Sequence, residues 1–264
     1  MPHVTRIVIY PIKALDGISV PSARISAAGT LEQDRNFALL DREGHYVNGK
    51  RNPAVHRLRC EFDLENRIVC LFREGSETRH RFQVDHERGL MEDWLGDFFG
   101  FPIQFQHQSP LGFPDDLDAF GPTIIGEATL TEIAAWYPEL GQAELSLRFR
   151  ANIEIDSEPA FWEDRLFDEP GTVVDFAIGS VRFEGSNPCQ RCVVPSRDPR
   201  SGEAYPSFQR IFAAKRKETL PSWATASRFN HYYRVSVNTR IPASQSGKEI
   251  RLGDELRIVG KRSL

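Results

Sequence analysis

The sequence lacks the long hydrophobic runs of membrane proteins. No stretch of its 264 residues approaches the roughly 20 consecutive apolar residues that a membrane-spanning helix needs. Its start, MPHVTRIVIYPIK, also lacks the basic leader and the long apolar segment of a secretory signal. We therefore expect a cytoplasmic protein without a membrane partner.

Cysteine is scarce as well. The chain has four cysteines, Cys60, Cys70, Cys189 and Cys192, which are too few to hold a chain of this length together by disulfides. In a reducing compartment they would remain thiols, so thiol chemistry is open to this protein.

An excess of positive charge is also missing. The net charge is −4, which gives no overall electrostatic attraction for DNA or RNA, and we expect no nucleic-acid partner. Any site for an anion must then be a local cluster of Lys and Arg. The composition of 40% hydrophobic and 27% charged residues is otherwise that of an ordinary globular protein with a substantial core.

Patterns of short β-strands dominate the first half of the chain. Apolar and β-branched residues alternate with polar ones, and turn signals such as Asp16-Gly17 separate the segments. The predicted strands are residues 6–11, 18–26, 37–41, 56–64 and 67–73. Apolar residues at helical spacing predict one amphipathic helix over 88–99, with Gly100 as its stop.

A connector rich in proline and glycine follows. Residues 107–122 have the composition of a linker or of an ordered loop that lines a site. We therefore place a domain boundary near residue 118 and predict two domains, 1–118 and 119–264.

The second half again predicts strands with few helices. Residues 129–137 predict a short helix, with a capping box formed by Thr129 and Glu132. Strands are predicted over 147–155, 172–184 and 232–238, and a closing hairpin over 249–259. The predicted fold class is therefore α+β and rich in β-structure.

The sharpest local motif is the segment Asn187-Pro188-Cys189-Gln190-Arg191-Cys192. A structural zinc needs about four ligands, and the chain offers no second cysteine pair and no closely spaced histidines. A dithiol redox site would begin a helix, which the prolines after the motif oppose. Buried, silent thiols remain an alternative, because free cysteine is often buried. Arg191 favours function, since a guanidinium stabilises the thiolate that binds soft metals or carries sulfur.

Other charged residues recur at turns. Taken singly, each of these cations could simply solvate the surface. They are Lys13, Arg35, Arg51, Arg148 and Arg150. Asp34 and Asp198 could be turn residues whose carboxylates accept backbone N–H groups.

Cys60 and Cys70 fit a structural role in the first half. Each shares a predicted strand face with the apolar residues two positions before and after it. We predict that both thiols point into apolar surroundings and tolerate substitution by Ala or Val.

Several segments, in order along nearly the whole chain, resemble MOSC proteins, a family named for the C-terminal domain of molybdenum-cofactor sulfurases. They are YPIKALDG (10–17), DRNFALLDREGHYV (34–47), GPTIIGEATL (121–130), RFRANIEID (148–156), NPCQRCVVPSRDPRSGE (187–203) and IRLGDEL (250–256). The cysteine segment is the most specific of these. The resemblance implies an N-terminal β-barrel-like domain followed by a MOSC β-barrel with short peripheral helices.

The resemblance also implies a molybdenum cofactor, that is, a molybdopterin whose phosphate is held by basic residues and whose metal is bound by one cysteine. Cys192 corresponds to that metal ligand, and Cys192 and Asp198 are the implied catalytic residues. The positions that match cofactor contacts are Lys13, Arg35, Arg150, Asn152, Arg191 and Cys192. The chemistry agrees, because a phosphate favours Arg and Lys and a metal with sulfur ligands favours a thiolate.

Some positions depart from the family pattern. Ala14 stands where the family often has a serine that could bind the phosphate, Ala151 where it has proline, and Pro195-Ser196 where it has two threonines. We expect neither the pyridoxal-phosphate domain of the full sulfurases nor a ferredoxin-like domain in this chain.

The function implied by the resemblance is an oxidoreductase that reduces N-hydroxylated or similar small substrates. The sequence has no recognisable iron–sulfur, flavin or haem motif, so a separate reductase would supply the electrons. The alternative is a sulfur carrier or cofactor-handling protein in which Cys192 holds a persulfide, and a third reading is a silent binding module. Stable molybdenum with turnover favours the enzyme, whereas labile sulfur without turnover favours the carrier.

Overall fold

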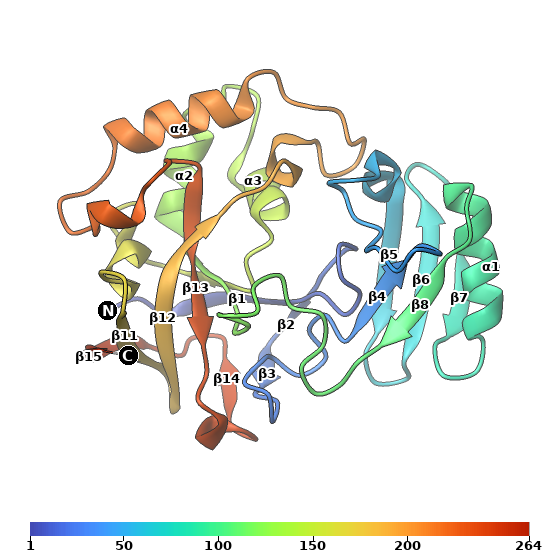
Figure 1. Ribbon diagram of the computed structural model, residues 1–264, viewed down its shortest axis with the longest axis horizontal. Helices are drawn as coiled ribbons and strands as arrows, with labels where there is room; N and C mark the ends of the chain where they lie inside the picture. Colours follow the sequence, from blue (N-terminus) through green and yellow to red (C-terminus); the bar gives the residue numbers. More distant parts are fainter. Residues whose placement is uncertain (264) are drawn as a thin grey trace.

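The chain forms a larger and a smaller body that lie side by side (Figure 1). The computed structural model describes residues 1–263. The larger body contains β1 (Val4–Ile9), β2 (Ile18–Val20), β9 (Ile124–Gly126), β10 (Ile153–Ile155), β11 (Thr172–Ile178), β12 (Val181–Gln190), β13 (Arg234–Arg240) and β15 (Leu256–Ser263). These form one sheet in the order β15-β11-β12-β13-β9-β10-β1-β2, in which only the β9–β10 pair is parallel. The protein is β-rich, as expected.

The start of the chain belongs to the same sheets as its second half. β1 pairs with β10, and β3 (Ser22–Arg24) pairs with β14 (Glu249–Arg251). Segments on both sides of residue 118 therefore share backbone hydrogen bonds, while the domain boundary itself stays a prediction. The consequence for the site is that the loop after β1 lies beside the residues that precede β10.

The smaller body carries its own apolar core. Its strands are β4 (Phe37–Leu40) with β8 (Gln104–His107), and β5 (Leu58–Asp63), β6 (Ile68–Arg73) and β7 (His80–Gln83) in a second sheet. Helix α1 (Arg88–Phe99) packs Met91 and Leu95 into this core. The predicted helix is confirmed, and Gly100 ends it in the left-handed conformation with φ of 80°.

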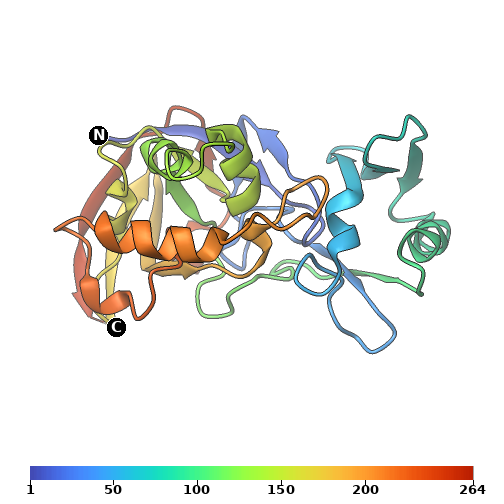
Figure 2. The same ribbon diagram turned by 90° about the horizontal axis from the view of Figure 1, so that it is seen from above.

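Three helices gather on one side of the larger body, α2 (Glu127–Ala134), α3 (Gln142–Phe149) and α4 (Phe208–Glu218) (Figures 1 and 2). They enclose an aromatic cluster that includes Tyr137, Phe149, Phe208 and Phe212. Helix α4 was not among the predicted elements. Its buried residues Phe208, Phe212 and Arg216 are four apart, which is the spacing of one helix face.

The structure corrects the predicted start of the second helix. α2 begins at Glu127 after Gly126, so the capping box of Thr129 and Glu132 is wrong. The hydroxyl of Thr129 instead donates to the buried Glu163 carboxylate at 2.8 Å. The Thr129 hydroxyl, which the local spacing predicted to cap the helix, thus bonds to a buried carboxylate from a distant segment instead.

Several strand predictions are also wrong, and the run predicted over 172–184 is divided into the paired strands β11 and β12. Residues 147–149 end α3, because Leu145 and Phe149, four residues apart, bury one helix face, and the strand starts only at Ile153. The hairpin over 249–259 does not form, since β14 pairs with β3 and β15 pairs with β11. Distant strands compete successfully with the local turn at Gly253.

The two cysteines of the smaller body differ. Cys60 is 6% exposed on the core face of β5, as predicted, and burial raises the pKa of its thiol well above the ordinary value. Cys70 is half-buried, because the core face of β6 is formed by Val69 and Leu71 instead. The prediction for Cys70 is therefore wrong, because the neighbouring residues of the strand, and not Cys70, point into the core.

No helix among residues 1–263 has the length and hydrophobicity of a membrane-spanning segment.

Candidate cofactor-binding site

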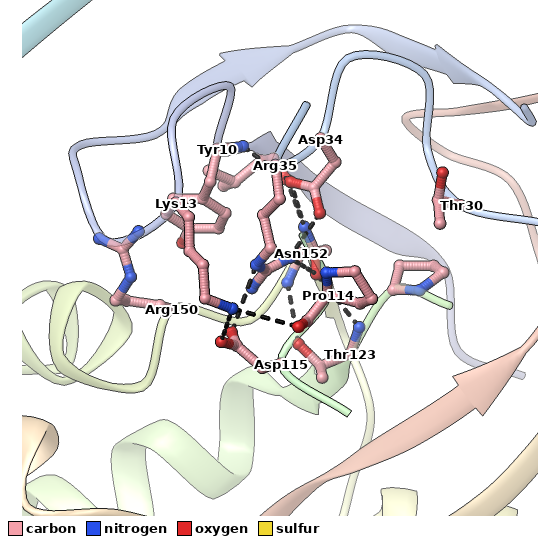
Figure 3. A network of polar contacts seen from close by, with 12 residues as sticks. Tyr10, Lys13, Thr30, Asp34, Arg35, Pro114, Asp115, Thr123, Arg150 and Asn152 are labelled. Atoms are coloured by element: carbon pink, nitrogen blue, oxygen red, sulfur yellow. Dashed lines mark hydrogen bonds and ion pairs between the residues drawn. The ribbon is translucent and has the colours of Figure 1, made fainter. Parts of the chain in front are cut away.

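Segments that are distant in the sequence meet where the loop after β1 joins β4 of the smaller body (Figure 3). The segments are residues 10–15, the turn at Asp34 and Arg35, residues 112–118, and residues 150–152 after α3. Residues 112–118 are called the strap from here on. Figure 3 shows Lys13, Arg35 and Asp115 pointing toward one another, whereas the guanidinium of Arg150 points away from Asp115.

Lys13 is fixed by β4 and covered by the strap. Its backbone N–H donates to the carbonyl of Phe37 at 2.8 Å, which aligns the loop with the edge of β4. Its ammonium donates to the carbonyl oxygens of Phe113 and Pro114, at 2.9 and 3.1 Å, and to the Asp115 carboxylate at 2.5 Å. Burial lowers the pKa of Lys13, and the charge of Asp115 acts in the opposite direction.

Arg35 stands in a left-handed turn, with φ of 52°. Its backbone N–H donates to the carbonyl of Tyr10 at 2.7 Å, and its guanidinium pairs with Asp34 and, at 3.3 Å, with Asp115. The side chain is only 15% exposed, yet both carboxylates keep it charged, because their negative charge outweighs the cost of burial and raises its pKa.

Asp34 and Asn152 connect this turn to the large sheet. One oxygen of Asp34 accepts the backbone N–H of Tyr10 at 2.8 Å and the amide of Asn152 at 3.1 Å. The Asn152 amide also donates to the carbonyl of Val8 at 3.0 Å, and its oxygen accepts from Arg35 at 3.5 Å. Asn152 is 1% exposed, so it is buried behind Arg35 and holds the guanidinium in position from the interior.

Tyr10 brings two cations together. Its ring lies 5.5 Å from the guanidinium of Arg35 and 4.1 Å from that of Arg150, within the range of cation–π contacts. Arg150 ends α3 in a left-handed conformation and donates to the carbonyl of Leu15 at 2.6 Å. Burial raises the pKa of Tyr10, while the charges of Arg150 and Arg35 act to lower it.

Asp115 supplies the negative charge between the cations. Its carboxylate contacts both Lys13 and Arg35, and its side chain is 68% exposed, on the solvent side of them. Partial burial acts to raise its pKa, but the charges of Arg35 and Lys13 outweigh this and hold the pKa well below 3.8. An anion is thus already held where two buried cations meet.

The cysteine motif leaves the end of β12 and contacts the end of α3. The guanidinium of Arg191 donates to the carbonyl of Phe149 at 2.5 Å and lies 3.2 Å from the sulfur of Cys189. The sulfur of Cys192 accepts the backbone N–H of Val194 at 3.4 Å. Both thiols are half-buried, and the one beside Arg191 is Cys189.

Asp198 closes the turn that follows the cysteine motif. One of its carboxylate oxygens accepts the backbone N–H groups of Arg200 and Ser201, at 2.9 and 2.7 Å. Burial acts to raise the pKa of Asp198, and these two N–H groups lower it overall. This is the structural turn role that the sequence left open, and a catalytic role stays a prediction.

The structure thus brings together Lys13, Arg35, Arg150 and Asn152. Arg191 bonds to the carbonyl of Phe149, the residue before Arg150, and its other contact is the sulfur of Cys189 rather than Asp115. Tyr10 and Asp115 were not among the predicted site residues. Tyr10 stands in the matching YPIK segment, which could have identified it, whereas Asp115 lies in a connector without a motif.

Matches to two family models cover most of the chain. Residues 1–94 match the MOSC N-terminal beta barrel domain, and residues 127–257 match the MOSC domain. The chain belongs to the MOSC family. Within this MOSC protein, the N-terminal match contributes Lys13 and Arg35, and the MOSC match contributes Arg150, Asn152 and both cysteines of the motif.

Characterised relatives of this MOSC protein are similar at low identity. Human molybdenum cofactor sulfurase is 26% identical over 250 residues, which cover 76% of this chain and 27% of the sulfurase. Human mitochondrial amidoxime-reducing component 1 is 24% identical over 236 residues, which cover 75% of this chain and 67% of that protein. The chain therefore spans about a quarter of the length of the sulfurase that it matches.

Proposed function

We propose that this MOSC protein binds a molybdenum cofactor and reduces N-hydroxylated or similar small substrates, with Cys192 as the protein ligand of the metal. The observation that carries the proposal is one anion position held by two largely buried cations, Lys13 and Arg35, with Arg150 nearby across the ring of Tyr10. The names of the relatives, a molybdenum cofactor sulfurase and an amidoxime-reducing component, favour this cofactor and this reaction.

The residues present fit the phosphate of such a cofactor. Lys13 and Arg35 already bind the Asp115 carboxylate, which occupies the place that the phosphate would take. Both cations are largely buried, so their donors are fixed in position and poorly solvated. Concentrating cations costs Coulomb energy, which a bound anion offsets. Asn152 and Asp34 hold Arg35 in place and would keep its donors aimed at the phosphate.

The cysteine motif fits a soft metal. The Cys192 sulfur accepts the backbone N–H of Val194 and is partly accessible, and a sulfur ligand is what a soft metal prefers. Arg191 contacts Cys189 and the end of α3, so it would fix the motif relative to Arg150. When bound, the molybdenum centre would supply the two-electron chemistry of the reduction. Cys192 would hold the metal, and Asp198 would keep the loop after Cys192 in shape.

The electrons would come from a separate reductase. The sequence has no recognisable motif for another redox group, so we propose a transient partner that delivers electrons to the half-exposed cysteine side of the site. The substrate would be a small molecule.

The test compares Cys192→Ser with Cys189→Ser, both purified from a host that makes molybdopterin. We expect Cys192→Ser to fold but to lose at least about 90% of the molybdenum-dependent reduction of benzamidoxime with an artificial electron donor, because a hydroxyl is a harder and less acidic ligand. Cys189→Ser should keep most of the activity. Molybdenum per chain is measured for both proteins.

Full activity in Cys192→Ser, or loss of activity only in Cys189→Ser, would overturn the assignment of the ligand. A wild-type protein that holds no molybdenum from this host would favour the alternative function. In that case Cys192 carries a persulfide for a client enzyme, as the relation to a sulfurase allows, and cyanide-labile sulfur on Cys192 would be the positive observation.

A further inference from the structure

The three donor positions of the Lys13 ammonium are all taken by the strap. They point to the carbonyl oxygens of Phe113 and Pro114 and to the Asp115 carboxylate. An ammonium has three N–H donors. A phosphate that binds Lys13 must therefore displace at least one of these acceptors, and the Asp115 side chain, which is 68% exposed, is the most accessible.

The strap holds Asp115 at this position from both sides. Before it, the backbone N–H of Phe113 donates to the carbonyl of Arg35 at 2.8 Å. After it, the Asp116 carboxylate accepts from Asn238 at 3.0 Å, and the carbonyl of Asp118 accepts from Arg240. The carboxylate of Asp115 therefore reaches the cations from a segment that is anchored to both bodies.

We propose that Asp115 is a built-in competitor that occupies the anion position of this site and determines which anions enter it. The carboxylate carries one negative charge, so a singly charged anion gains little by replacing it. A phosphate group with two charges gains more from Lys13, Arg35 and the nearby Arg150. Binding would release Asp115 into solvent, where it is already largely exposed. The inference rests on the proposed function only in using the same anion position.

The test measures pyrophosphate binding to cofactor-free protein by isothermal titration calorimetry. Asp115→Asn removes the competing charge and nearly keeps the shape, so it should bind pyrophosphate about tenfold more tightly than wild type. Asp118→Asn is the matched control, because it removes the same charge from an exposed position of the same strap. It should bind like wild type.

Two further measurements separate competition from a structural role. Asp115→Asn should have a lower Tm without ligand, because Lys13 and Arg35 lose their counter-charge, and a larger rise in Tm with pyrophosphate than wild type. Hydrogen exchange of a peptide covering residues 111–119 should accelerate in wild type when pyrophosphate binds. A purely structural Asp115 would lower the Tm without tightening the binding.

Equal pyrophosphate affinity in wild type and Asp115→Asn would overturn the competitor while leaving the anion site and the proposed function intact. If pyrophosphate binds none of the three proteins, the anion site itself is wrong and the proposed function loses its main support. Tighter binding in both Asp115→Asn and Asp118→Asn would reduce the effect to net charge and would also overturn the competitor.

Discussion

At the scale of single residues, His56 is a buried imidazole surrounded by cations. It is 8% exposed, and its Nε2 has no hydrogen-bond partner among the described residues. Burial, together with the charges of Arg197, Arg150 and Arg59, lowers the pKa of His56 from 6.5 to about 4. The unfolded chain thus takes up a proton near pH 6.5, whereas the folded protein resists protonation until about pH 4.

This difference in pKa predicts that the protein is less stable in mild acid. The free energy of unfolding is unaffected by His56 above pH 6.5, and it decreases by up to about 3 kcal/mol as the pH falls toward 4, because only the unfolded chain then binds the proton. His56→Leu should remove this part of the pH dependence. The free energy of unfolding in urea, measured at pH 7 and pH 4.5, checks it. The exposed His86, changed to Leu, is the control, and an equal decrease in wild type and His56→Leu would contradict the prediction.

At the scale of elements, the strap depends on a close backbone approach at Gly112. Its φ is 70°, and a Cβ there would lie 2.7 Å from the carbonyl oxygen of Arg35. Neither atom can move aside without shifting the strap or the Arg35 turn. Glycine therefore permits the contact that places Asp115 over the cations.

Gly112→Ala should destabilise the protein by about 2 to 3 kcal/mol, because it combines left-handed strain with a backbone clash. Gly44→Ala is the matched control, since its φ is 78° but no atom lies within 4 Å of the added Cβ. It should cost about 1 kcal/mol from the backbone conformation alone. Urea unfolding of both variants gives the comparison, and equal losses would show that the close approach at Gly112 is unimportant.

Arg59 joins the smaller body to the loop after the cysteine motif. Its guanidinium donates to the carbonyls of His56 and Pro199, at 2.7 and 3.1 Å, and pairs with Asp16 at 3.2 Å. The side chain is 17% exposed, so these bonds are poorly replaced by water. The loop at Pro199 therefore owes part of its order to β5.

We predict that Arg59→Met loosens this loop and speeds tryptic cleavage after Arg197 or Arg200. The loss of two bonds from a charged donor should cost about 2 kcal/mol and increase the cleavage rate at least about tenfold. Arg79→Met is the control, because Arg79 pairs with Glu61 on the surface with 47% of its side chain exposed. Timed digestion followed by mass spectrometry identifies the cut. Unchanged cleavage in Arg59→Met would show that the loop is held by other contacts.

Features that depend on local spacing could be predicted from the amino-acid sequence. The β-rich fold and helix α1 with its end at Gly100 were predicted correctly. Both depend on the periodic spacing of apolar side chains and on a glycine that can adopt the left-handed conformation, which are properties of a few adjacent residues. The resemblance carried by short motifs also marked Lys13, Arg35 and Arg150, which the structure brings together.

Features that depend on partners distant in the chain could not be predicted in this way. β14 pairs with β3 across most of the chain rather than with its neighbour β15, and Cys70 lies on the outer face of β6 because the core selects Val69 and Leu71. Asp115 bonds to Lys13 although the two residues are 102 positions apart in the chain. Coulomb attraction and burial act between residues that are close in space, and the order of residues along a strap without a motif does not encode which cations it will meet.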